Sequence, residues 1–326
     1  MSFIEVRQIS KTFRIVKKKN GLKASIKSFF KREYMDVAAV QDVSFTIEKG
    51  EIVGYIGPNG AGKSTTIKIL SGILVPDSGE CKINGMVPWQ NRVKYVKNIG
   101  VVFGQRSQLW WDIPASDTFD LLRDIYEIPE NEYQATKEDL INRLNLTDII
   151  NIPVRQLSLG QRMRCEIAAS LLHNPEILFL DEPTIGLDAI SKQVVRDFIK
   201  ELNKDKHTTV ILTSHDMTDI TTLAKRVILI GKGQILYDGS LKKLEQQYET
   251  EKYVSIKTKD NLTIRKKGIL KKTKNKEGYD LVIDTKYVSI SELLNLISKK
   301  VRIEDIEIDH ENIDSIIVKM YQDYKI

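Results

Sequence analysis

The order of apolar and polar positions along the chain predicts a parallel sheet flanked by helices. Short apolar runs at 51–56, 177–180 and 209–212 are typical of strands buried on both faces, and a helical pattern over 191–202 separates the last two. This strand, helix, strand order predicts parallel pairing. A further helical region is expected over about 105–175.

The composition of the sequence changes beyond about residue 240, where glycines become fewer and charged residues more frequent. Strands are predicted there at 253–256, 281–283 and 303–308, and helices at 290–297 and 313–321. We therefore expect an α/β domain over residues 1–240 and a small α+β accessory domain over residues 241–326.

A basic stretch lies between the first two predicted strands, 3–9 and 43–47. Residues 14–32 contain lysines and arginines but no acid. Four apolar residues in it recur at helical spacing: Leu22, Ile26, Phe29 and Phe30. The insertion, about 14–37, is either a solvated surface segment or an amphipathic helix that contacts lipid headgroups or a partner.

Composition excludes several classes of protein. The 326 residues include 50 Lys and Arg against 44 Asp and Glu, and a net charge of +6 gives no reason to expect a nucleic-acid partner. Cys81 and Cys165 lie far apart, so we expect no disulfide framework. No apolar run approaches the ~20 residues that span a bilayer, so we expect no transmembrane segment, and any membrane role requires a partner.

The most informative stretch is a glycine-rich turn between the strand at 51–56 and a helix that opens at 66–70. The turn consists of Gly57, Pro58, Asn59, Gly60, Ala61, Gly62, Lys63, Ser64 and Thr65. Its glycines allow backbone N–H groups to surround a phosphate, and the helix N-terminus adds a positive dipole end. Lys63 supplies a charge for the β- and γ-phosphates, and Ser64 supplies a hydroxyl for Mg²⁺. This turn predicts a nucleoside triphosphate site.

Polar side chains follow three other apolar runs. Asp181 and Glu182 end one run, where ligands bind in parallel sheets. We predict that Asp181 reaches Mg²⁺, directly or through water, and that Glu182 deprotonates an attacking water. His215 is a candidate to hydrogen-bond the γ-phosphate, and Gln105 is a candidate to contact Mg²⁺ and the water.

A second helix terminus with the character of an anion site follows Leu157. Ser158 is predicted to cap a helix whose first turn contains Gly160 and Gln161. The site has no lysine of its own, which suits a role in closing over a nucleotide held elsewhere. A plain helix cap is the alternative.

Together these motifs resemble those of the ATP-binding cassette (ABC) ATPase family over about residues 1–240. The matching motifs are Walker A at 57–65, the glutamine loop at Gln105, the signature at 157–161, Walker B at 177–182, the D-loop at 186–188 and the switch histidine His215. The resemblance implies a P-loop NTPase fold with a helical subdomain. Leu159 replaces the glycine that is usual in the signature, whereas Ser158 and Gly160 match it.

The resemblance also implies ATP and Mg²⁺ as cofactors and an ATPase activity. In this family two cassettes associate head to tail, so we expect a homodimer or a pair with a second ABC ATPase. Four residues would then contact the nucleotide of the opposite subunit: Ser158, Gly160, Gln161 and Asp188. Either Phe13 or Tyr34 would stack on the adenine.

The C-terminal region and residues 105–114 resemble those of exporter ATPases whose membrane permeases are separate chains. This implies an exporter ATPase that is cytoplasmic and peripheral on the inner face of the cell membrane. Trp110 and Trp111 either pack in the core or lie near the groove that receives the permease. An importer ATPase and a soluble ABC ATPase without a role in transport are the alternatives.

Overall fold

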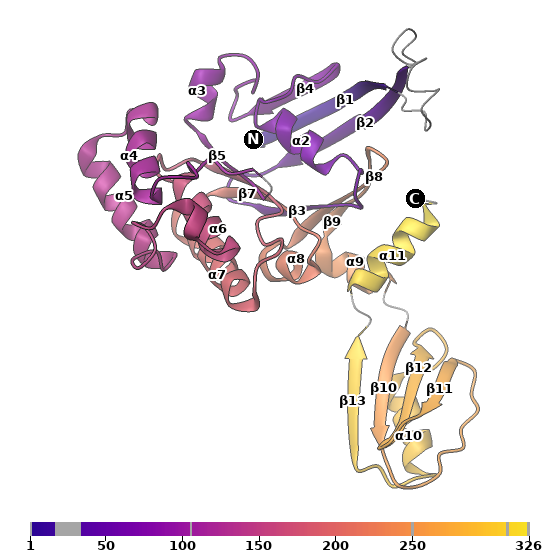
Figure 1. The fold of residues 1–326 in the computed structure, drawn as a ribbon. Coiled ribbons are helices and arrows are strands. Elements are labelled where there is room, and N and C mark those ends of the chain that lie inside the picture. The colour runs from indigo at the N-terminus through magenta and orange to yellow at the C-terminus, as the bar shows by residue number, and fades with distance from the viewer. Residues whose placement is uncertain (1, 17–33, 105, 249–250, 311–312, 325–326) are drawn as a thin grey trace, which may run out of the picture. The chain divides into compact units, whose positions relative to one another are not determined.

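Residues Met1–Gly239 and Ser240–Ile326 form two units, each with its own hydrophobic core (Figure 1). The structure, a computed structural model, describes residues 2–16, 34–104, 106–248, 251–310 and 313–324. The proposed amphipathic helix of the basic insertion and the predicted site residue Gln105 lie outside these ranges.

A six-stranded sheet carries the predicted motifs of the first unit. Its strands, in spatial order, are β5 (Ile99–Phe103), β6 (Ile177–Asp181), β7 (Thr209–Thr213), β3 (Ile52–Ile56), β8 (Arg226–Gly231) and β9 (Gln234–Ser240). The contacts between β5 and β6, β6 and β7, β7 and β3, and β3 and β8 are all parallel, which confirms the predicted pairing. Every residue of β6 and β7 is buried, as expected for parallel strands covered on both faces.

An antiparallel sheet packs against this one through a shared core. Its order is β2 (Tyr34–Ile47), β1 (Ile4–Val16) and β4 (Ser78–Ile83). Apolar residues of all three strands join those of β3, β6 and helix α2 (Lys63–Leu70) in one cluster. β1 continues well past the predicted end at residue 9, because its outer half pairs with β2 as far as Val16 opposite Tyr34.

The predicted helical region contains α4 (Ala115–Tyr126), α5 (Glu130–Arg143), a 3₁₀ turn (Val154–Gln156) and α6 (Leu159–Ala169). Figure 1 shows α4 and α5 together at one side of the first unit, and α6 contacts both of them as well as α7 (Ala189–Lys206). Two short helices complete this unit, α3 (Arg92–Val96) and α8 (Met217–Leu223). Trp110 and Trp111, just before α4, are 58% and 52% exposed, so the alternative that they are core residues is wrong.

The second unit contains a four-stranded antiparallel sheet with a helix on one face. The strand order is β11 (Ile269–Lys274), β12 (Gly278–Asp284), β10 (Glu251–Lys257) and β13 (Asp305–His310). Helix α10 (Ile290–Ser298) contributes Leu293 and Ile297 to the core of this sheet. Helices α9 (Leu241–Tyr248) and α11 (Ile313–Asp323) contact each other. The sequence pattern did not predict β11, because it is an edge strand in which three of the six residues are exposed lysines.

No helix in the described part of the chain is long and apolar enough to cross a membrane.

The separate cores predict that damage to the second unit leaves the first intact. Leu293 is fully buried, and Leu293→Ala should lower the free energy of unfolding of the second unit by about 2–5 kcal/mol through loss of contacts and a cavity. ATP affinity should stay unchanged. Urea unfolding and nucleotide titration measure both quantities. Leu270→Ala, at a residue that is 55% exposed, is the control and should change stability by less than about 0.5 kcal/mol. A loss of ATP affinity in Leu293→Ala would contradict the independence of the two units.

Candidate active site

The loop between β3 and α2 passes close to other backbone and requires glycine. Gly60 and Gly62 have φ angles of +79° and +107°, which favour a residue without Cβ. A Cβ at Gly62 would lie 2.2 Å from the carbonyl oxygen of Ala39, so any side chain there would push β2 away. The loop leads directly into the N-terminus of α2, where an anion is favoured.

Lys63, the first residue of α2, is held against this loop. Its Nζ donates hydrogen bonds to the carbonyl oxygens of Gly57 at 2.7 Å and Pro58 at 3.3 Å. Burial lowers the pKa of Lys63, and the carboxylates of Glu182 and Asp181 act in the opposite direction. A cation fixed beside the loop and two acids suits the binding of a phosphate together with a metal ion.

The phosphate loop, α2 and the ends of β5 and β6 enclose one cleft of about 450 Å³. The residues that line it are Asn59, Ser64, Lys68, Ile73, Phe103, Gly104, Arg106, Asp181 and Glu182. The carboxyl edge of a parallel sheet is where such folds bind ligands. Four predicted site residues, Asn59, Ser64, Asp181 and Glu182, thus share one cavity.

A buried hydroxyl holds both acids in place. Asp181 lies opposite Thr213 in the pairing of β6 with β7. Thr213 Oγ1 donates to Asp181 Oδ1 at 2.7 Å and accepts a hydrogen bond from the backbone N–H of Glu182 at 3.0 Å. Thr213 was not among the predicted residues, because a threonine at the end of an apolar run has no distinctive signal by itself.

The donor set of the cleft fits Mg²⁺. Ser64 and Asp181 bring a hydroxyl and a carboxylate to the same cavity, and oxygen ligands are those that Mg²⁺ prefers. Among the residues described by the structure, no three or more His, Cys, Asp or Glu side chains form a metal cage. Mg²⁺ in nucleotide sites is held by one or two protein ligands together with phosphate and water, so a small donor set is sufficient.

Glu182 and His215 form a close pair at the edge of the cleft. His215 Nε2 lies 2.6 Å from Glu182 Oε1. Glu182 has a φ of +58°, an unusual conformation for a residue with a side chain and one that often marks functional sites. Both residues also line a second cavity of about 250 Å³. The Glu182 carboxylate, a proton acceptor, thus lies beside the His215 imidazole, which can orient it.

The N-terminus of α6 contacts the start of α7. Ser158 Oγ accepts from the Gln161 N–H at 3.2 Å and Gln161 Oε1 accepts from the Ser158 N–H at 2.8 Å, which is a capping box. A Cβ at Gly160 would lie 2.3 Å from Ser191 Oγ, so this glycine allows the two helices to approach. Asp188 caps α7 through two 2.8 Å hydrogen bonds from Ser191, and these bonds lower the pKa of Asp188.

These signature residues are not assembled with the phosphate loop within one chain. The described residues that line the two cavities do not include Ser158, Gly160 or Gln161. Leu159, beside them, is 38% exposed. The predicted anion site at the start of α6 is therefore not part of the cleft that Ser64 and Asp181 line.

The two candidate aromatic residues lie on the paired strands β1 and β2. Phe13 is half-buried and lies opposite Val37. Tyr34 is exposed, and the guanidinium carbon of Arg14 lies 4.8 Å from the centre of its ring. Both rings are within reach of solvent, and both stay candidates.

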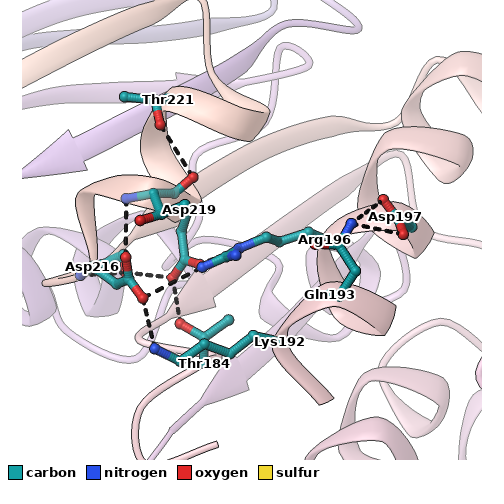
Figure 2. A network of polar contacts seen from close by, with 10 residues as sticks. Thr184, Lys192, Gln193, Arg196, Asp197, Asp216, Asp219 and Thr221 are labelled. Atoms are coloured by element: carbon teal, nitrogen blue, oxygen red, sulfur yellow. Dashed lines mark hydrogen bonds and ion pairs between the residues drawn. The ribbon is translucent and has the colours of Figure 1, made fainter. Parts of the chain in front are cut away.

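A buried ionic network supports the loops that carry Glu182 and His215 (Figure 2). Asp219, which is fully buried, accepts from Arg196 Nε at 2.6 Å and from Ser214 Oγ at 2.7 Å, and it also accepts from the hydroxyl of Thr184. Thr184 follows Glu182 by two residues and Ser214 precedes the histidine of the pair. The network therefore ties both loops to Arg196 on α7.

A second carboxylate extends this network. Asp216 Oδ2 accepts from Lys192 Nζ at 2.6 Å and from Arg196 Nη2 at 3.3 Å, as Figure 2 shows. None of these residues was predicted to support the site. One signal was available: Arg196 lies among the apolar residues of α7 that are buried, and a buried arginine requires an acidic partner.

Comparison with known proteins agrees with this geometry. Residues 40–185 match the family described as ABC transporter. The chain is 37% identical over 216 residues to the ABC transporter ATP-binding protein NatA of Bacillus subtilis, which covers 66% of this chain and 86% of NatA. It is 33% identical over 210 residues to the linearmycin resistance ATP-binding protein LnrL of the same species, with 64% and 67% covered. It is 32% identical over 230 residues to the methionine import ATP-binding protein MetN 2 of Enterococcus faecalis, with 69% and 66% covered.

A solved structure shows the same fold. It is a dimer of the ATP-binding cassette MJ0796 in a post-hydrolysis state, bound to ADP and Pi. The superposition has a TM-score of 0.61 with 26% sequence identity and covers 73% of this chain and 98% of that cassette.

The network of Figure 2 predicts a large cost for removing its central charge. Asp219→Asn should lower the free energy of unfolding by about 3–5 kcal/mol, because Arg196 would keep a buried charge without its main partner. Urea unfolding measures this loss. The control is Asp197→Asn on α7, next to Arg196 in the sequence, where an exposed carboxylate contacts only Gln193 among the residues drawn, and it should cost less than about 0.5 kcal/mol. Equal effects of the two substitutions would show that the network is not stabilising.

Proposed function

Because the chain belongs to the ABC transporter family of ATP-binding proteins, and is an ATP-hydrolysing enzyme, we propose that it energises export through separate membrane permease subunits. The observation that carries the proposal is the cleft in which Asn59 and Ser64 of the phosphate loop meet Asp181 and Glu182, with His215 Nε2 2.6 Å from Glu182 Oε1. The chemistry at this cleft, the pairing of two cassettes and the direction of transport are separate parts of the proposal.

ATP binding is assigned to the phosphate loop. The backbone N–H groups of residues 57–65 and the N-terminus of α2 bind the β- and γ-phosphates, and Lys63 adds its positive charge. The closeness of Gly62 to Ala39 supports this role, because a side chain at residue 62 would displace the loop from its position beside β2. Phe13 or Tyr34 stacks on the adenine.

Hydrolysis is assigned to Glu182 as the general base. A water attacks the γ-phosphorus and gives a proton to the Glu182 carboxylate, while the bond from the γ-phosphorus to the bridging oxygen breaks and ADP leaves. His215 orients Glu182 through the 2.6 Å contact and hydrogen-bonds the γ-phosphate. Thr213 holds the backbone of Glu182, so the base is positioned from both sides.

Mg²⁺ is assigned to Ser64, Asp181 and Gln105. When bound, the ion neutralises charge on the phosphates. Ser64 and Asp181 provide the oxygen ligands in the cleft, and the Thr213 hydroxyl keeps the Asp181 carboxylate oriented.

A second cassette is proposed to complete the site. The start of α6 does not line the cleft of its own chain, and a helix N-terminus capped by Ser158 suits an anion brought by another subunit. In a head-to-tail dimer Ser158, Gly160, Gln161 and Asp188 of one chain cover the ATP held by the other. We therefore propose that the chain forms a homodimer or pairs with a second ABC ATPase.

Export is proposed as the direction of transport. The 33% identity to a linearmycin resistance ATP-binding protein supports it, since resistance to a drug fits its removal from the cell. The exposed Trp110 and Trp111, which follow Gln105 in the sequence, are proposed to contact the permease, which would place the protein on the inner face of the membrane. Import is the second candidate, supported by the 32% identity to a methionine import ATP-binding protein. Co-purification in detergent with a permease, with or without a substrate-binding protein, separates the two.

The proposed base predicts a trapped dimer. Glu182→Gln should lower the ATP turnover rate by about 100-fold or more while ATP affinity is kept, because the amide cannot accept the proton. With Mg²⁺ and ATP the variant should elute as a dimer in size-exclusion chromatography, and with EDTA it should return to a monomer.

Glu176→Gln is the matched control, because Glu176 lies just before the opposite end of β6 and contacts only surface partners among the described residues, Lys49 and Asn84. It should hydrolyse ATP normally. Normal hydrolysis by Glu182→Gln would refute its role as the base, and a monomer that is saturated with ATP would refute the dimer.

A further inference from the structure

Glu166 is a buried acid that the reaction does not use. It lies in the middle of α6, and only 4% of its surface is exposed. A carboxylate in such a place is costly unless hydrogen bonds satisfy it. The partners of Glu166 therefore indicate what the residue does.

Those partners all belong to the segment that follows Gln105. The Ser107 hydroxyl donates to Glu166 Oε1, and the Gln108 N–H donates to Glu166 Oε2 at 3.1 Å. The Gln108 side chain also donates to the backbone carbonyl oxygen of Glu166 at 3.0 Å. Burial raises the pKa of Glu166, and the hydrogen bonds from Ser107 and Gln108 act in the opposite direction.

Gly104, just before Gln105 in the sequence, contacts Asp181 and Glu182. The Gly104 N–H donates to the Asp181 carbonyl oxygen at 2.8 Å, and a Cβ at Gly104 would lie 2.5 Å from the Glu182 carbonyl oxygen. Arg106 lines the cleft. A short stretch of chain thus touches Asp181 and Glu182 at one end and α6 at the other.

The rest of α6 is tied elsewhere. Arg164 Nη1 donates to the carbonyl oxygens of Leu144 and Asn145, at 2.8 and 2.9 Å, just beyond α5. These bonds hold α6 to its helical neighbours and do not involve the cleft. Arg164 therefore binds α6 to the residues after α5, whereas Glu166 binds it to the segment after Gln105.

We propose that Glu166 is a positioning residue that fixes the segment after Gln105 to α6, so that this segment and the signature at the start of α6 respond together to bound ATP. The inference rests on the proposed function, because it assumes that the start of α6 contacts nucleotide in a dimer. Without the carboxylate, ATP still binds and α6 still docks on the partner, but this docking no longer reaches Asp181 and Glu182 through the segment.

The kinetic test compares Glu166→Ala with Glu166→Gln. The alanine variant should lose about tenfold in kcat with KM for ATP and ATP affinity changed by less than about threefold, because turnover needs the alignment and phosphate binding does not. Glutamine keeps the shape and an oxygen acceptor for the Gln108 N–H, so it should restore most of the turnover.

The control is Arg164→Met, which removes the hydrogen bonds of α6 to the segment beyond α5. It should lower the melting temperature and leave kcat close to that of the unmodified chain. A loss of turnover in Arg164→Met as large as that in Glu166→Ala would overturn the inference, because any loosening of α6 would then have the same effect.

Hydrogen exchange in the Glu182→Gln background supplies the second measurement. With Mg²⁺ and ATP, the peptides over 106–110 and 157–162 should both gain protection in the parent variant. With Glu166→Ala added, only 157–162 should gain it. Equal protection of both peptides in the two proteins would overturn the inference. Failure of the parent to dimerise would instead overturn the proposed function, so the two failures are distinguishable.

Discussion

Asp181 and Glu182 owe their positions to the hydroxyl of Thr213, a fully buried residue on the neighbouring strand. Two parallel strands place it there, because β6 and β7 pair with Asp181 opposite Thr213. A shift of one residue in this register would turn every side chain of β6 to the other face of the sheet. The register of two buried strands thus decides where the proposed metal ligand Asp181 and the proposed base Glu182 lie, and the remaining parts of the site are arranged around them.

Two supports extend outward from these acids. The network of Asp219 and Arg196 holds the loops that carry Glu182 and His215 against α7, and it is buried, so its loss is costly. Gly104 also contacts Asp181, and Gln108, four residues further along the chain, is hydrogen-bonded to Glu166 of α6. The first support keeps the pair in place, and the second is proposed to make it responsive to what the start of α6 contacts.

Contiguous motifs were predictable from sequence, whereas long-range partners were not. The phosphate loop is one stretch between a strand and a helix, so its place at the edge of a parallel sheet followed from the pattern around it. Thr213, Asp219 and Glu166 have no motif of their own, because their roles depend on residues 20 or more positions away in the chain. β11 was missed for a different reason: its residues are mostly exposed at the edge of a sheet, so the strand lacks the alternation of apolar and polar residues. Gln105 lies outside the described residues, so its predicted role stays a prediction.

The central proposal is that each ATP is bound by the phosphate loop of one chain and the start of α6 of another. Complementation tests this most directly. Lys63→Ala removes the phosphate-binding cation and Ser158→Arg blocks the start of α6, so neither variant alone should hydrolyse ATP. A mixture contains dimers in which an intact Lys63 of one chain faces an intact Ser158 of the other, and the account predicts that it regains activity. A mixture as inactive as its two components, or full activity of Ser158→Arg alone, would contradict it.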